Sequence, residues 1–246
     1  TSMGAIVGVL YADGYEPEKI LSLITEQKMT HKSKIMSLDI KSSELGIFSK
    51  KYIASFLDKT LHTDSFDSLP KPFYCATTNL MTAQGEIISS GDKLKKYTLA
   101  SMAIPVLFQS VVIDSMVYID GGITNNLPAC AIREKCDILI GIDVNPYTEV
   151  KKISNIKEAV MRTMTTMVMN TSKEGRECCD YVVDVYASHD YSILDFAKFK
   201  EIYKIGYDAG VRFLLNHPEL LKISKDFKDK QLHKKQETDS KKKKRK

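Results

Sequence analysis

Apolar positions recur at two spacings along the chain. A spacing of three to four residues predicts helices at residues 4–12, 16–27, 46–61, 91–103, 158–170 and 199–215. Short runs of apolar and β-branched residues predict strands at residues 72–79, 110–120, 136–144 and 181–187. The third of these helices has Ser49 as its expected cap, and residues 110–120 are expected to form two strands that turn around Asp114 and Ser115.

The run CDILIGIDV at 136–144 is apolar along most of its length rather than at every second position. A strand of this kind is typical of a sheet that helices cover on both faces. Together with the alternation of strands and helices, it predicts an α/β fold with a layered, largely parallel sheet between helices. The Met-rich segment 158–170 is expected to pack in the core of this domain.

The charge of the chain is concentrated at one end. The net charge is +5, but residues 222–246 alone carry +8, which leaves residues 1–221 mildly acidic. This predicts one folded domain over residues 1–221 and a basic, disordered tail over 222–246. The alternative for the tail is a polybasic contact with anionic lipid or nucleic acid. With Phe227 as its one aromatic residue, the tail offers no platform for base stacking, so nucleic acid is not the expected partner.

The cysteines and histidines predict neither a disulfide framework nor a metal site. The five cysteines are odd in number, lack a Cys-x-x-Cys pair, and include the adjacent Cys178 and Cys179. The five histidines contain no His-Glu-x-x-His motif, so no metal or cofactor is expected. Reduced cysteines and the lack of any run of about 18 apolar residues suggest a cytoplasmic protein, with contact at a membrane surface left open. The sequence does not indicate an oligomeric state.

The chain opens on TSMG, which matches half of a Gly-x-Ser-x-Gly turn. Such a turn exposes the serine hydroxyl at the start of a helix, whose N–H groups can receive a developing oxyanion. Ser2 is therefore a candidate nucleophile and Gly4 a supporting glycine. The alternative is that Thr1 and Ser2 are an expression scar or a frayed end ahead of Met3.

Asp120 closes a predicted strand and is followed by Gly121, Gly122 and a loop that contains Asn125. An aspartate at the carboxyl end of a strand points toward the usual ligand crevice of an α/β fold. The alternative is an ordinary Asp-Gly turn. The segment ASMAIPVLF at 100–108 predicts close packing before Pro105 and carries no chemistry of its own.

Three segments resemble the patatin-like phospholipases: residues 1–20, 100–128 and 136–146. They are most similar to compact bacterial members related to the esterase domain of neuropathy target esterase. The resemblance implies a fold like that of cytosolic phospholipase A2 and a Ser–Asp dyad that needs no metal or cofactor. In that dyad Ser2 attacks the ester carbonyl of a lipid and forms an acyl-enzyme, and Asp120 is the base. Gly4, Gly121, Gly122 and Asn125 would support the substrate or the loops around it.

The resemblance also implies that a first strand and a glycine-rich oxyanion loop precede Thr1, so the chain is expected to be a fragment that lacks part of the catalytic machinery. Two alternatives remain. A Ser-His-Asp esterase would use His189, since Ser2, Asp120 and His189 follow the order of an α/β-hydrolase triad. A non-catalytic protein on the same fold would bind a lipid or a partner.

Overall fold

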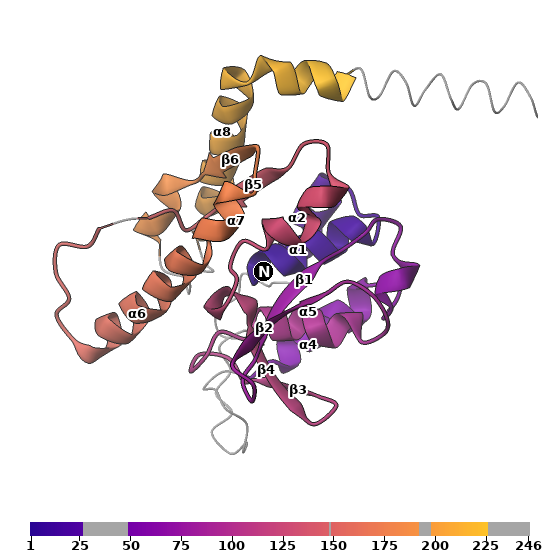
Figure 1. Cartoon of the computed structure of the whole chain (residues 1–246), viewed down its shortest axis with the longest axis vertical. Coiled ribbons are helices and arrows are strands. Elements are labelled where there is room, and N and C mark those ends of the chain that lie inside the picture. Colours follow the sequence, from indigo (N-terminus) through magenta and orange to yellow (C-terminus); the bar gives the residue numbers. More distant parts are fainter. Residues whose placement is uncertain (27–48, 148, 192–197, 226–246) are drawn as a thin grey trace, which may run out of the picture.

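The structure is a computed structural model that describes residues 1–26, 49–147, 149–191 and 198–225 (Figure 1). Its helices are α1 (Met3–Ala12), α2 (Pro17–Glu26), α4 (Lys51–Thr60), α5 (Leu94–Ser101), α6 (Ile156–Thr171), α7 (Lys173–Glu177) and α8 (Phe199–Asn216). Its strands are β1 (Cys75–Asn79), β2 (Gln84–Ile88), β3 (Val111–Ile113), β4 (Met116–Asp120), β5 (Ile140–Asp143) and β6 (Tyr181–Asp184). These elements match the predicted ones within a few residues, except that β2 and α7 have no counterpart among the predictions.

Four strands form one antiparallel sheet in the order β2-β1-β4-β3. The β3–β4 hairpin turns at Asp114 and Ser115, as the sequence predicts. Both residues have positive φ angles, 49° and 68°, which is the pattern of a type I′ turn. In the centre of the sheet, Thr77 of β1 pairs with Asp120 of β4, so Asp120 is held in the sheet at the point where its loop begins.

The prediction of a largely parallel sheet is not confirmed in the described residues. Only β5 and β6 run parallel, and they form a separate two-stranded sheet beside α7 and α8 (Figure 1). The apolar strand at 136–144 is not covered on both faces either. Gly141 and Asp143 are buried, whereas Ile140 and Ile142 are 43% and 63% exposed. Apolar composition indicates which residues tolerate burial. It does not indicate which strand pairs with this one, in which direction, or whether both faces are covered.

An ion cluster holds the carboxyl ends of the parallel pair together. Arg176 of α7 donates to Asp143 of β5 at 2.8 Å and to Asp184 of β6 at 2.6 Å. The pKa of Arg176 is raised, first by its hydrogen bond with Asp184, so the guanidinium stays charged. One arginine therefore joins α7 to both strands.

The hydrophobic core lies between α1, α2, α4, α5 and the antiparallel sheet. Helix α1 buries Ile6, Val9 and Leu10 completely. Its small residues permit close contact, because a Cβ added at Gly8 would lie 3.1 Å from the ring of Phe73. Gly14, with φ +103°, follows the end of α1 as the sequence predicts.

Two further predictions concern helix packing. The backbone N–H of Lys51 donates to the Ser49 hydroxyl at 3.2 Å, so Ser49 does bind the start of α4, although Lys50 is the capping residue.

In α6 the methionines were expected in the core, but Met169 is the only one of the four that is buried, and Met167 is 39% exposed.

The carboxyl end of the chain is described only in part. Residues 218–225 are helical, and the rest of the basic segment, 226–246, lies outside the described residues, as does the stretch 27–48. Across the ranges that the structure describes, none of the helices is both long and apolar enough to span a bilayer.

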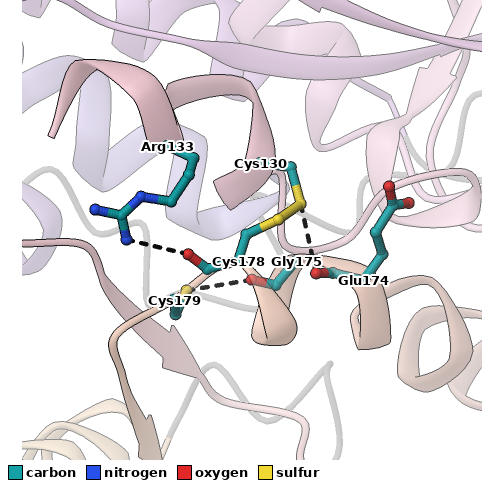
Figure 2. Close-up of a disulfide and its surroundings, with 6 residues drawn as sticks. All are labelled: Cys130, Arg133, Glu174, Gly175, Cys178 and Cys179. Atoms are coloured by element: carbon teal, nitrogen blue, oxygen red, sulfur yellow. Dashed lines mark hydrogen bonds between the residues drawn. A yellow bond between two sulfur atoms is a disulfide. The ribbon is translucent and has the colours of Figure 1, made fainter.

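A disulfide between Cys130 and Cys178 corrects the prediction that the cysteines are all reduced. Figure 2 shows that it joins the 3₁₀ helix Ala129–Lys135 to the residue that follows α7. Arg133 supports the same junction by donating to the carbonyl oxygen of Cys178 at 3.2 Å. The sequence could not reveal this pair, because 48 positions separate the two cysteines and their approach depends on the tertiary fold.

Alkylation under denaturing conditions is expected to modify three cysteines without reductant and five after reduction, since Cys75, Cys136 and Cys179 are free thiols. Intact mass spectrometry measures both numbers. Closing a loop of this length contributes about 2–4 kcal/mol to stability, so reduction should lower the free energy of unfolding by a similar amount. Modification of all five cysteines without reductant would contradict the disulfide.

Candidate active site

Ser2 lies at the start of α1 with a backbone conformation that L-residues rarely adopt, φ 55° and ψ −135°. This is the strained geometry of a sharp turn into a helix, which lifts the serine side chain away from the backbone. The Ser2 N–H donates to the carbonyl oxygen of Ser101 at 3.1 Å and to the Ser101 hydroxyl at 3.2 Å. Ser2 is therefore part of an ordered turn, which argues against a frayed end.

Asp120 is the last residue of β4 and is only 5% exposed. Its Oδ1 accepts a hydrogen bond from the N–H of Gly122 at 2.8 Å. Its backbone is fixed on both sides, because its N–H donates to Ala103 at 3.0 Å and its carbonyl oxygen accepts from the Thr78 hydroxyl at 3.0 Å. The carboxylate thus has little freedom to move.

The environment of Asp120 gives it the properties of a base that works near neutral pH. Burial raises the pKa of its carboxyl group to about 6. The hydrogen bond from Gly122 and hydrogen bonding with the Ser2 side chain oppose this rise in the pKa. The fold therefore brings together the two residues, 118 positions apart, that the sequence named as nucleophile and base.

The glycines of the Asp-Gly-Gly loop differ in what their surroundings demand. A Cβ on Gly121 would lie 2.2 Å from the carbonyl oxygen of Ala76, so no other residue fits there. A Cβ on Gly122 would lie 3.0 Å from Asn126 and 3.1 Å from Asp120. A Cβ added at Gly4 would meet no other described part of the chain within 4 Å, so packing against the described residues does not require this glycine.

Asn125 connects the loop to the amino end of the chain. Its N–H donates to the carbonyl oxygen of Gly121 at 2.8 Å, and its own carbonyl oxygen accepts from the Thr1 hydroxyl at 3.1 Å. The side chain of Asn125 makes no contact that identifies it as a substrate ligand. Asn125 therefore supports the loop through its backbone hydrogen bonds.

Two backbone donors remain available beside Ser2. Within the described residues, the N–H groups of Met3 and Gly4 have no acceptor. They lie at the first turn of α1, where the helix dipole favours negative charge. A strained serine, a buried carboxylate and free N–H groups are the parts that acyl transfer requires.

Comparison with known sequences agrees with this geometry. The family model described as patatin-like phospholipase matches residues 1–131, which is more than half of the chain and contains both Ser2 and Asp120. The chain belongs to the patatin-like phospholipase family.

Its relatives confirm the similarity to the neuropathy target esterase group. The chain is 27% identical to lysophospholipase NTE1 of Kluyveromyces lactis over 87% of its length and 17% of that protein. It is 25% identical to lysophospholipase NTE1 of Saccharomyces cerevisiae over 87% of this chain and 14% of that protein. It is 26% identical to mouse patatin-like phospholipase domain-containing protein 7, over 85% of this chain and 18% of that protein. The chain thus spans less than a fifth of the length of these relatives.

Three side chains of the chain support the site and were not singled out from the sequence. They are Thr78, Ser101 and Thr171, the last of which donates to the carbonyl oxygen of Gly122 at 2.7 Å. Each acts on backbone atoms of the site through a hydroxyl group. Nothing in the sequence distinguishes them from other buried serines and threonines, because their role depends on which loop the fold brings to them.

The structure does not test the remaining catalytic candidate, His189. His189 falls in the 3₁₀ helix Tyr186–Asp190 that follows β6, and its side chain lies outside what the structure describes, so the triad stays a hypothesis. In the described ranges, no three His, Cys, Asp or Glu residues are grouped as metal ligands would be.

Proposed function

We propose that the protein hydrolyses the carboxylic esters of lipids, with lysophospholipids as the first substrate class to test. The observation that carries this proposal is the buried Asp120, whose pKa burial raises to about 6 and the Ser2 side chain lowers in turn, beside a strained helix start at Ser2. Two relatives are named lysophospholipases, which suggests the substrate class.

In the proposed reaction, the Asp120 carboxylate takes the proton of the Ser2 hydroxyl while Oγ attacks the ester carbonyl. The N–H groups of Met3 and Gly4 are donors for the oxyanion that forms. Asp120 then gives the proton to the leaving alcohol, and Ser2 keeps the acyl group. In the second half, Asp120 takes a proton from water, the resulting hydroxide attacks the acyl-enzyme, and the fatty acid leaves as Ser2 regains its proton.

The raised pKa of Asp120 suits this cycle. A carboxylate with its ordinary pKa near 4 is too weak a base to deprotonate a hydroxyl efficiently at neutral pH. At about 6 the group is still mostly ionised at pH 7, yet it holds a proton more strongly. The base form is lost as the pH falls through 6, so activity should fall with it.

The rate of covalent labelling by a fluorophosphonate is expected to rise with an apparent pKa near 6 and to stay level above pH 7. The assay uses the natural protein. Peptide mass spectrometry locates the adduct, which should be on Ser2. An adduct on another residue, or a labelling rate that is independent of pH between 5 and 8, would contradict the proposal.

The same assay separates the two alternatives. Under the dyad, replacing His189 by Ala leaves labelling and hydrolysis unchanged, whereas a Ser-His-Asp esterase would lose several orders of magnitude. A natural gene product that forms no adduct and hydrolyses no lipid ester would be the non-catalytic binding protein.

The location of the protein is a separate proposal. We keep the cytoplasm, with contact at a membrane surface through the basic tail, as the working assignment. The Cys130–Cys178 disulfide weighs against a reducing compartment and so against the cytoplasm.

A further inference from the structure

The sequence assigns no chemistry to residues 100–108, yet the first residues of this segment contact both members of the proposed dyad. At the carboxyl end of α5, the carbonyl oxygen and the hydroxyl of Ser101 accept hydrogen bonds from the Ser2 N–H at 3.1 and 3.2 Å. Two residues further on, the carbonyl oxygen of Ala103 accepts from the Asp120 N–H at 3.0 Å. The backbone of residues 101–103 therefore contacts both Ser2 and Asp120 and fixes their positions relative to each other.

The Ser101 side chain is fully buried, and its hydroxyl is held from two sides. Its oxygen accepts from Ser2, and it also hydrogen bonds with the thiol of Cys75. Burial raises the pKa of Cys75 to about 11, so this thiol is neutral and keeps its proton, which points to the carbonyl oxygen of Tyr97 at 3.5 Å. The Ser101 hydroxyl thus lies in a buried group of polar atoms that includes the Ser2 N–H and the Cys75 thiol.

Ser2 needs such a fixed partner because of its backbone conformation. A non-glycine residue at φ 55° and ψ −135° is strained, and strain of this kind persists only where the surroundings hold the residue in place. The two hydrogen bonds to Ser101 act on the N–H group that immediately precedes the strained Cα. Loss of one of them lets the turn relax and moves Oγ away from its attack position, where small displacements cost much of the rate.

We infer that Ser101 is a positioning residue, which holds the backbone of Ser2 in the conformation needed for attack without touching the substrate. This inference rests on the proposed function.

The chain provides a matched control one turn earlier in the same helix. Thr98 is also fully buried in α5, but its hydroxyl has no hydrogen-bond partner among the described residues. Replacing Thr98 by Val removes a buried hydroxyl of the same helix at nearly constant volume. Since that hydroxyl is unpaired, its removal should be neutral or slightly stabilising.

The experiment compares Ser101→Ala and Thr98→Val in the natural gene product, using the kinetics of fluorophosphonate inactivation. For Ser101→Ala we expect kinact to fall about tenfold, the loss that one hydrogen bond in a reacting geometry can cause, while KI and the apparent pKa near 6 stay unchanged. Ser101→Cys keeps the size of the side chain but weakens the acceptor, so its kinact should fall between those of wild type and Ser101→Ala. For Thr98→Val both constants should stay within twofold of wild type.

Each outcome decides something definite. An unchanged kinact in Ser101→Ala, or an equal loss in Thr98→Val, would overturn the positioning role while leaving the proposed function intact. A fall in kinact that matches a fall in the melting midpoint, in both Ser101 variants, would show a purely structural residue. Absence of a Ser2 adduct in the wild-type protein would remove the proposed function and this inference together.

Discussion

Replacement of Asp120 by Asn is expected to lower the rate of ester hydrolysis about 10³-fold and, at neutral pH, to make the folded protein more stable. The amide keeps the shape of the carboxyl group, and its oxygen can still accept the hydrogen bond from Gly122. It cannot take a proton, so the general base is lost. Steady-state hydrolysis of a lysophospholipid measures the first effect and denaturant unfolding the second.

The gain in stability follows from the direction of the pKa shift. The pKa of Asp120 is about 6 in the folded protein and 3.8 in a model compound, so the folded state favours the protonated form. The carboxyl group therefore costs nothing below about pH 4, and its cost grows between pH 4 and 6, where the unfolded chain is ionised and the folded protein still holds the proton. Above that pH the cost is about 2–3 kcal/mol, which Asn removes. The two proteins should have similar free energies of unfolding at pH 4 and differ at pH 8.

A carboxylate away from the site provides the control for Asp120. Asp114, in the β3–β4 turn, pairs with Lys93 and has a side chain that is 70% exposed. Asp114→Asn should leave hydrolysis unchanged and alter the free energy of unfolding by less than about 1 kcal/mol. Near-wild-type hydrolysis in Asp120→Asn would refute the role of Asp120, and a loss of stability at pH 8 would refute the account of its burial.

Replacement of Gly121 by Ala is expected to destabilise the protein by about 3 kcal/mol or more and to abolish activity. The new Cβ would lie 2.2 Å from the carbonyl oxygen of Ala76 and 2.9 Å from the backbone nitrogen of Thr77. These are backbone atoms of β1, the central strand, so they cannot turn aside as a flexible side chain would. The loop after Asp120 must move instead, and the carboxylate moves with it. Thermal unfolding and hydrolysis both report the change.

Gly206 is the matched control for Gly121. It lies inside α8, and a Cβ placed there would have no other described part of the chain within 4 Å. Gly206→Ala should raise the free energy of unfolding by up to about 1 kcal/mol, because alanine favours the helix, and should leave hydrolysis unchanged. If Gly121→Ala behaved like Gly206→Ala, the close approach of the loop to β1 would be wrong.

Local features of this fold could be predicted from the sequence because their causes are local. The small residues of α1, the stop at Gly14 and the hairpin turn at Asp114 and Ser115 each depend on neighbours along the chain. Ser2 and Asp120 were predicted as a pair through a family resemblance that three segments carry together, since neither glycine-containing turn identifies a site alone.

Features that depend on distant partners could not be predicted in the same way. Apolar composition identified β5 as a strand but not its direction relative to the main sheet or its exposed face. The pairing of Cys130 with Cys178 joins segments 48 positions apart. The contact between Ser101 and the Ser2 N–H could not be predicted for the same reason, because it exists only where the fold brings α5 against the start of α1.

The separate β5–β6 pair has a consequence for handling the protein. Among the described strands, each member of this pair has a neighbour on one side only, and Ile142 and Val144 are more than half exposed. An unpaired strand with apolar side chains is a template on which a strand of another molecule can add. Concentrated solutions of the isolated chain should therefore lose material to intermolecular sheet formation before the antiparallel sheet around Asp120 unfolds.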